Sequence, residues 1–255
     1  LHVENYHPQT QRSKESQVKN MRILYDGSLT PHPLSGIERY FTMIVSHLPR
    51  QAKVSCSSRS SREALRIGPH EVSAPPVSAF RPRRLSGLLD TACWAGKHFD
   101  LVHWMYYGPS QMGARLRRNG VPYVLTVHDL IHEIHGAPAG LLDRQARQES
   151  YTSASVILCV SSHTRNDLLE QYEVPPEKTH VIHHGSNMQP SEGTNTDLAV
   201  GPKYFLHVGS RSGYKNFSSL LPVLQDVRRT HPDIQLRLAG PSLNSTEREI
   251  IRTYG

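Results

Sequence analysis

Short apolar runs alternate with longer amphipathic stretches along most of the chain. The short runs lack the in-and-out polar alternation of a half-exposed strand, which predicts strands buried on both faces of a parallel sheet. The longer stretches place apolar residues at helical spacing, as residues 37–48 do. Strands that alternate with helices predict an α/β fold of the doubly wound type. The strands predicted in this first part are "RILYD", "DLVHW", "PYVLTV", "SVILCV" and "THVIHHG".

A polar stretch rich in Gly and Pro at residues 186–202 interrupts this alternation and predicts a linker. The alternation then resumes with the strand "KYFLHVG", a helix, the strand "IQLRLAG" and the opening of another helix. Residues 1–20 are polar and without periodicity, which predicts a disordered extension. We therefore expect a first domain at residues 21–185 and the beginning of a second at residues 203–255.

The predicted second unit, residues 203–255, is too small to fold alone. Two strands and two helices cannot cover both faces of a parallel sheet. Three explanations stay open: the chain is a fragment, the gene is truncated, or this unit packs on a partner.

Composition restricts the class of protein. A chain of 255 residues can bury a sizeable core, and no apolar run of about eighteen residues suggests a membrane span. The first twenty residues lack the apolar segment of a signal peptide, so a cytoplasmic location is expected. Cys56, Cys93 and Cys159 are odd in number and scattered, which argues against a disulfide framework and a cysteine metal site. Cys159 lies in an apolar run and is expected to be a buried thiol.

The formal net charge of +7 suggests an acidic partner, and a basic surface without function is an equal alternative. The basic stretches at residues 59–66 and 81–89 lack interleaved aromatic residues, and no helix-turn-helix or RNA-binding pattern occurs. We therefore expect no nucleic-acid partner. Peripheral contact of these stretches with an anionic membrane, at its inner face, is a hypothesis.

The first candidate site is the segment "DGSLTPHPLSGIERY", between the first predicted strand and the first predicted helix. A glycine-containing loop that runs into a helix N-terminus presents backbone N–H groups to a phosphate. Gly36 stands at the mouth of this helix, where a side chain would block close approach. The spacing is not that of a dinucleotide fingerprint, and an ordinary structural turn is the favoured alternative.

The second candidate is "VGSRSGYKN", which follows a predicted strand and precedes a predicted helix. Gly209 and Gly213 free the backbone, while Arg211 and Lys215 supply two cations at the carboxyl end of a parallel strand. That end is where α/β sheets bind ligands, and the two cations suit a diphosphate. Solvated surface charges are the alternative.

The third candidate is "HDLIHEIH", whose spacing is close to the H-E-x-x-H pattern of zinc proteases. The strand "PYVLTV" immediately precedes His128 and therefore puts it at a strand tip instead of inside a helix. Asp129 also replaces the glutamate that such a site needs as a base. We expect no metal here, and a histidine satisfied by backbone groups is a further alternative. That alternative suits His132 and His135 better than His128.

Together these segments resemble the retaining glycosyltransferases of family four, which have the GT-B fold. The resemblance runs from Met21 to Gly255. It implies two Rossmann-like domains that face a cleft, with a nucleotide-diphosphate sugar bound mainly by the second and an acceptor mainly by the first. The segments that carry it are "MRILYDGS", "SGIERYF", "VLTVHDLIHE", "VSSHTRNDL", "VIHHGS" and "YFLHVGSRSGYKNF".

By position, the resemblance implies that Gly36 lies beside the donor diphosphate and that His128 contacts the donor sugar near the reacting carbon. It makes Arg211 and Lys215, in the loop that starts at Gly209, the pair that neutralises the diphosphate leaving group. Fixed cations stabilise the charge that develops there, so no metal is required. Such enzymes retain anomeric configuration through same-face attack assisted by the leaving phosphate, and no protein base is assigned.

The expected reaction moves a hexose, with mannose as the first candidate, from a GDP- or UDP-linked donor to a glycan or lipid-linked acceptor, as in polysaccharide or lipopolysaccharide biosynthesis. No other cofactor is expected. The family's paired glutamates, E-x7-E, have no counterpart here, because Glu247 and Glu249 occur too early and at the wrong spacing. We therefore expect weak or no activity from this chain alone. A truncated or degenerate homologue that binds a nucleotide sugar without turnover is the alternative.

Overall fold

The computed structural model describes most of the chain, with several gaps. The expected extension at residues 1–20, residues 186–201 of the expected linker, and the basic stretches at residues 59–66 and 81–89 lie outside the described residues. The described residues are 21–26, 36–57, 70, 72–73, 96–108, 111–136, 143–185, 202–211 and 213–254.

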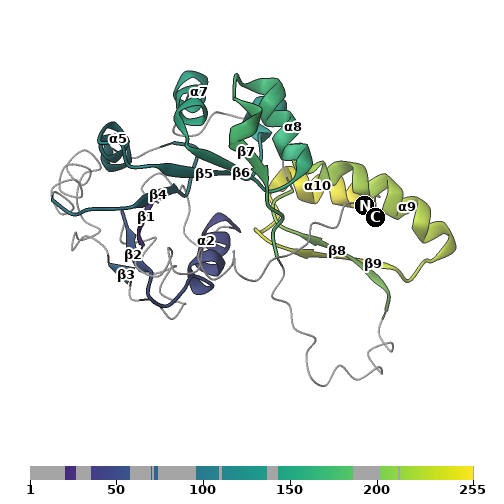
Figure 1. Ribbon diagram of the computed structural model, residues 1–255. Coiled ribbons are helices and arrows are strands. Elements are labelled where there is room, and N and C mark those ends of the chain that lie inside the picture. Colours follow the sequence, from purple (N-terminus) through teal and green to yellow (C-terminus); the bar gives the residue numbers. More distant parts are fainter. Residues whose placement is uncertain are drawn as a thin grey trace, which may run out of the picture. The chain divides into compact units, whose positions relative to one another are not determined.

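The chain divides into two compact units, residues 1–185 and residues 186–255 (Figure 1). Unit 1 is built on a seven-stranded sheet in which every pairing is parallel. The α/β fold with a parallel sheet, predicted from the alternating pattern, is confirmed. The strands in spatial order are β3 (Val72–Ser73), β2 (Lys53–Cys56), β1 (Arg22–Asp26), β4 (Leu101–Trp104), β5 (Tyr123–Val127), β6 (Val156–Cys159) and β7 (Thr179–Val181).

This strand order reverses direction at β1. The chain steps outward from β1 through β2 to β3, then returns to β4 on the other side of β1 and continues to β7. Open α/β sheets bind ligands beyond the carboxyl ends of the strands, close to such a reversal. The carboxyl edge of the unit 1 sheet is therefore the place to look for a site.

Helices lie on both faces of the sheet (Figure 1). Two of them begin at side-chain caps, where Asp143 accepts from the Ala146 N–H at 2.8 Å and Ser161 accepts from the Thr164 N–H at 3.0 Å. The helices of unit 1 are α2 (Gly36–Ser46), α5 (Gln111–Arg118), α6 (Ile131–Ile134), α7 (Arg144–Ser153), α8 (Ser162–Gln171) and the short 3-10 turn η1 (Pro176–Lys178).

The strands alternate between two apolar layers. Ile23 and Tyr25 pack with Phe41 of α2 on one face, whereas Leu24 belongs to the layer on the other face, which includes residues of α5, α7 and α8. Cys159 is fully buried in this second layer, as expected, and burial raises the pKa of its thiol to about 11. Strands buried on both faces explain why the sequence shows unbroken apolar runs.

Unit 2 contains two parallel strands, β8 (Tyr204–Val208) and β9 (Gln235–Ala239), with α9 (Leu220–Thr230) and α10 (Ser245–Tyr254) and the 3-10 turns η3 (Gly213–Lys215) and η4 (Phe217–Ser219). Phe217, Leu221 and Leu224 are buried. In contrast, Leu206 and Val208 on β8 keep 56% and 70% of their surface exposed. Within the described residues, one face of this small sheet is thus uncovered, as expected for two strands alone.

No helix among the described residues combines the length and the apolar character needed to cross a bilayer.

Candidate active site

Aromatic and histidine side chains gather at the carboxyl edge of the unit 1 sheet. His128 directly follows β5, and His184 stands three residues after the end of β7. Because all seven strands are parallel, these strand ends share one edge of the sheet. Tyr40 reaches this group from α2, so three elements that are distant in sequence contribute to it.

His128 is held by ring contacts. Its ring meets Tyr40 edge to face with centroids 5.0 Å apart, and it lies 5.7 Å from the His184 ring and 6.3 Å from the Phe41 ring. The His128 Nε2 atom is buried and has no hydrogen-bond partner in the described part of the chain. A buried ring nitrogen without a partner is costly, and such groups are concentrated at functional sites.

A second layer of polar contacts lies beneath these rings. The buried His103 of β4 shares a hydrogen bond with the Thr126 hydroxyl, with Nε2 and Oγ1 2.9 Å apart, and the Tyr40 hydroxyl lies 3.5 Å from the same oxygen. His103 also packs against Phe41 and Tyr25. Thr126 therefore links a histidine inside the sheet to the tyrosine that contacts His128.

Burial keeps both histidines neutral. Loss of solvation lowers the pKa of His103 to about 3 and that of His128 to about 4, with smaller contributions from His128 and His184 respectively. At neutral pH, each ring of the pair therefore carries one N–H donor and one acceptor nitrogen. His128 can bind a hydroxyl group in either direction without adding charge to the site.

The other two histidines of the "HDLIHEIH" segment do not join His128. The helix α6 begins at Ile131, so His128 and His132 do not share a helix, and His135 is exposed. Nowhere in the described ranges do three His, Cys, Asp or Glu side chains converge as a metal site requires. The zinc-protease spacing therefore has no geometric counterpart here.

A buried ion pair fixes the segment after His128. The Glu133 carboxylate accepts from Arg147 of α7 at 2.7 Å and from the Tyr172 hydroxyl at 2.5 Å. These contacts lower the pKa of Glu133 against the opposing effect of burial, which is the largest single contribution. The Tyr107 hydroxyl donates to the Asp129 carbonyl at 3.1 Å. Two helices and the end of β4 thus anchor the loop that carries His128.

Gly36 begins α2, and a Cβ atom built there would meet no atom of the described residues within 4 Å. The loop that precedes it, residues 27–35, lies outside the described residues. The structure therefore does not test the expected contact of Gly36 with a phosphate.

The remaining predicted residues belong to unit 2. Gly209 follows β8 with φ +108°, and a Cβ atom on Gly240 would lie 2.5 Å from the Gly209 carbonyl oxygen, so these two backbones approach very closely. Lys215 is exposed, with its ammonium 4.9 Å from the centre of the Tyr214 ring. Arg211, in contrast, has a side chain that is only 3% exposed.

Arg211 is held by its own domain. Its Nε and Nη2 atoms donate to Glu247 at 3.1 and 3.2 Å, and Nη2 also donates to the carbonyls of Pro241 and Ser242. Glu247 is itself fixed at the start of α10, where it exchanges two hydrogen bonds with Asn244 as a capping box. The structure therefore joins Arg211 to Glu247, a partner that sequence spacing did not suggest.

The sequence also did not single out His184, Tyr40, Thr126 or His103. A signal was present for His184, because "VIHHGS" follows a predicted strand as "HDLIHE" does. Tyr40 appeared only as one apolar position of a helix. His103 lies inside "DLVHW", where a histidine in a buried strand needs a polar partner.

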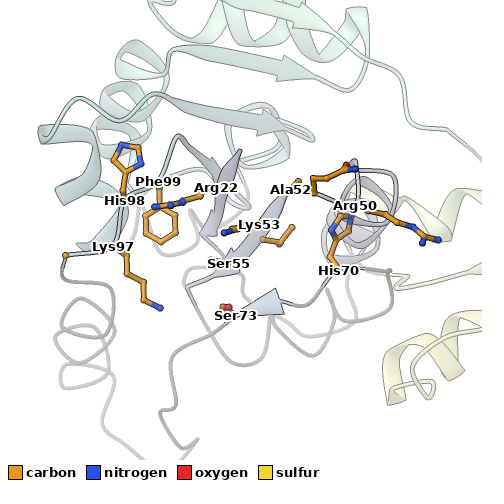
Figure 2. Close-up of a pocket in the computed structure, with 13 residues that line it drawn as sticks. Arg22, Arg50, Ala52, Lys53, Ser55, His70, Ser73, Lys97, His98 and Phe99 are labelled. Atoms are coloured by element: carbon orange, nitrogen blue, oxygen red, sulfur yellow. The ribbon is translucent and has the colours of Figure 1, made fainter. Parts of the chain in front are cut away.

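A separate pocket of about 730 Å³ lies at the opposite, amino edge of the unit 1 sheet. Arg22 and Lys53, the first residues of β1 and β2, line it together with Ser55 and Ser73 (Figure 2). Its lining carries several basic side chains, and it does not include His128 or His184. The carboxyl edge remains the candidate site, because it brings buried polar groups together with His128, which the sequence singled out.

The family model described as Glycosyltransferase Family 4 matches residues 34–190, more than half of the chain. The chain belongs to glycosyltransferase family 4. This segment contains Gly36, His128 and His184, so the carboxyl-edge cluster of unit 1 lies entirely within the matched part.

Similar proteins agree with this assignment. The D-inositol 3-phosphate glycosyltransferase of Corynebacterium diphtheriae is 25% identical over a match that covers 56% of this chain and 38% of that protein. This family 4 chain therefore spans less than half the length of that relative.

Two solved structures share the fold. The lipopolysaccharide outer core galactosyltransferase WaaB in its apo form is 17% identical with a TM-score of 0.57, over 92% of this chain and 65% of that one. Anabaena Alr3699/HepE, in complex with UDP and glucose, is 20% identical with a TM-score of 0.58, over 92% of this chain and 64% of that one. Both support the GT-B type of fold for this family 4 chain.

Proposed function

We propose that this chain forms the acceptor-side domain and the start of the donor-side domain of an enzyme that transfers a hexose from a nucleoside diphosphate to a glycan or lipid-linked acceptor, with retention of anomeric configuration. The observation that carries the proposal is the neutral His128 at the carboxyl edge of a family 4 sheet, whose buried Nε2 has no hydrogen-bond partner among the described residues. The names of the similar proteins favour this class of donor, since one was solved with UDP and glucose.

His128 would hydrogen-bond a hydroxyl of the donor sugar next to the anomeric carbon. Glycosyl transfer passes through a transition state in which positive charge develops at that carbon. A protonated imidazole there would oppose that charge, whereas a neutral one can bind the hydroxyl without that repulsion. Burial of His128, which lowers its pKa to about 4, therefore suits this role.

The loop at Gly209 would hold the donor diphosphate. The positive φ of Gly209 turns the chain sharply after β8, and the exposed Lys215 offers an ammonium to the phosphates. Arg211 would contribute through Nη1, because within the described residues its hydrogen bonds use Nε and Nη2. Glu247, and not the bound diphosphate, would orient the Arg211 guanidinium.

The donor's sugar is proposed as a hexose. Mannose, suggested by the sequence resemblance, and the glucose and galactose in the names of the solved structures all belong to this class. The nucleotide is proposed as UDP or GDP, with UDP the first to test because of the Anabaena complex.

The test is a transfer and donor-hydrolysis assay on the protein that contains this chain, with labelled UDP- and GDP-hexoses. His128→Ala should lower turnover about a hundredfold, the usual loss when one hydrogen bond to the transition state is removed. His135→Ala, seven residues later and exposed, should leave turnover unchanged. Equal activity of the two variants would show that His128 takes no part in the reaction. Binding of UDP-hexose by ligand-observed NMR without any turnover would favour a homologue that binds only.

A further inference from the structure

His184 contacts the same rings that hold His128. It stands after β7, is exposed, and lies 4.8 Å from the Tyr40 ring centroid at a tilt of 35°. The His128 ring is 5.7 Å from it. Together with the Tyr40–His128 distance of 5.0 Å, these values make a triangle of three rings in mutual contact. Each ring comes from a different part of the chain.

Among the described residues, ring packing orients the His128 imidazole. No hydrogen bond to the His128 ring occurs within the described residues, and its Nε2 is buried without a partner. The neighbouring rings therefore determine which way the two nitrogens point. Tyr40 and Phe41 supply two of these contacts from α2, and His184 supplies the third from the β7 end.

Tyr40 is more firmly fixed than His184. The ring of Tyr40 packs edge to face against Phe41 at 5.0 Å, and its hydroxyl lies 3.5 Å from the Thr126 hydroxyl. His184 is the exposed member, so it covers the other two rings on the side that faces water. Removing its ring would open a path for water to Tyr40 and His128 and free the His128 imidazole to rotate.

We infer that His184 is a positioning residue, whose ring covers Tyr40 and His128 and thereby holds the His128 imidazole in one orientation, shielded from water. The effect on sugar transfer rests on the function proposed above, whereas the effect on the His128 ring itself does not. An aromatic ring of similar size at position 184 should serve equally well.

A purely electrostatic role makes a different prediction. Among the described residues, the titratable groups that face His128 are Tyr40 from α2, His103 from β4 and His184, with Asp129 next in the chain. Burial is the larger cause of the lowered His128 pKa and the charge of His184 the smaller one. Phe at position 184 keeps the cover and removes the charge, whereas Ala removes both.

The decisive experiment follows the His128 ring protons by NMR during a pH titration of the chain and of His184→Ala and His184→Phe. The His128 signal is identified by its loss in His128→Gln. With Ala, water reaches the ring and its pKa should rise from about 4 toward the ordinary 6.5. With Phe, it should stay close to the value in the unchanged chain.

Controls separate this result from a folding defect. His103 is buried with its pKa lowered to about 3, so in every variant that folds correctly it should not titrate above about pH 5. His180→Ala changes an exposed histidine of β7 and should leave His128 unaffected. An unchanged His128 titration in His184→Ala would overturn the inference. An equal rise in Ala and Phe would overturn it too, since charge and not cover would then be responsible.

The kinetic readout tests the consequence for transfer. In the protein that contains this chain, His184→Ala should lower kcat about tenfold with little change in the donor KM, because a misplaced catalytic group affects the transition state most. His184→Phe should restore most of kcat. Equal kcat for Ala and the unchanged protein would contradict the positioning role. If the unchanged protein transfers no sugar, the proposed function fails while the NMR result still decides the role of His184.

Discussion

The two edges of the unit 1 sheet hold their ionisable groups in opposite ways. At the carboxyl edge, His103 is buried and His128 is half-buried, both have lowered pKa values, and the nearby Glu133–Arg147 pair has both side chains less than 10% exposed. At the amino edge, Arg22 and Lys53 are exposed and line an open pocket. The same sheet therefore has one edge where charge is costly and another where charge is hydrated.

Burying an ionisable group costs free energy that exposure avoids. If charged groups served only solubility, they would be exposed to water, as they are at the amino edge. The carboxyl edge keeps several polar groups away from water, and at least one of them, His128 Nε2, lacks a partner among the described residues. This difference is the physical reason to assign the site to the carboxyl edge, and it can be tested by disturbing each edge in turn.

The largest effect is expected from breaking the buried ion pair. Glu133→Ala should lower the free energy of unfolding by about 3–5 kcal/mol, because it leaves the Arg147 guanidinium buried without its counterion. Urea denaturation followed by circular dichroism measures this. The control is Glu149→Ala on α7, whose exposed carboxylate accepts a hydrogen bond from Gln145 at 3.3 Å. It should cost less than about 0.5 kcal/mol.

A double replacement sharpens this prediction. Glu133→Met combined with Arg147→Leu removes both charges and fills the space with apolar atoms, so it should cost far less than Glu133→Ala. If the single and the double replacement destabilise equally, the pair acts through packing alone and the electrostatic contrast between the edges is wrong at this position.

Much of the fold was predictable because buried parallel strands have unbroken apolar runs. The sequence "VILC" of β6 is such a run. The strands β2 and β3 were missed, since "KVSC" and "VS" are short and half polar. β2 depends on pairing with β1, and β3 depends on pairing with β2. Sequence patterns report the local burial of a segment, whereas these two strands are defined by backbone hydrogen bonds to a neighbour that is distant in sequence.

The site was predictable only where the position of a single residue in the sequence indicated its role. His128 followed from its place after an apolar strand. The contact of Tyr40 with His184 depends on how α2 and the end of β7 pack in space. The two residues are 144 positions apart, and no sequence pattern between them indicates the contact. Arg211 was expected to face an anion, yet the structure pairs it with Glu247. The sequence signal for the position of Glu247 was the N-x-x-E capping box that begins at Asn244.

A smaller effect is expected from mild acid. The folded pKa values of His128 and His103, about 4 and about 3, lie below the unfolded value of about 6.5, so the unfolded chain binds more protons below that pH. Their contribution to stability is complete above about pH 6.5 and is lost as the pH falls toward the folded values. Each histidine can contribute up to about 1.4 kcal/mol per pH unit in this window.

Urea midpoints measured between about pH 7 and about pH 5 test this, because Glu133, with its lowered pKa, loses its contribution only at still lower pH. His128→Gln removes one of the two contributions and should flatten the dependence. The exposed His180 should have no such influence when it is replaced by Ala. A stability that is constant across this range would mean that both rings titrate normally and that the carboxyl edge is as hydrated as the amino edge.

The smallest effect is expected at the amino edge. Arg22 and Lys53 are register partners at the heads of β1 and β2, so their side chains leave the sheet on the same face with like charges adjacent. Because both are exposed, water and salt screen the repulsion, and Lys53→Ala should change the free energy of unfolding by no more than about 0.5 kcal/mol in either direction. Any gain in stability should be largest at low salt, where screening is weakest. A loss of about 2 kcal/mol or more would show that this edge also depends on a specific charge, and the contrast between the two edges would then no longer identify the site.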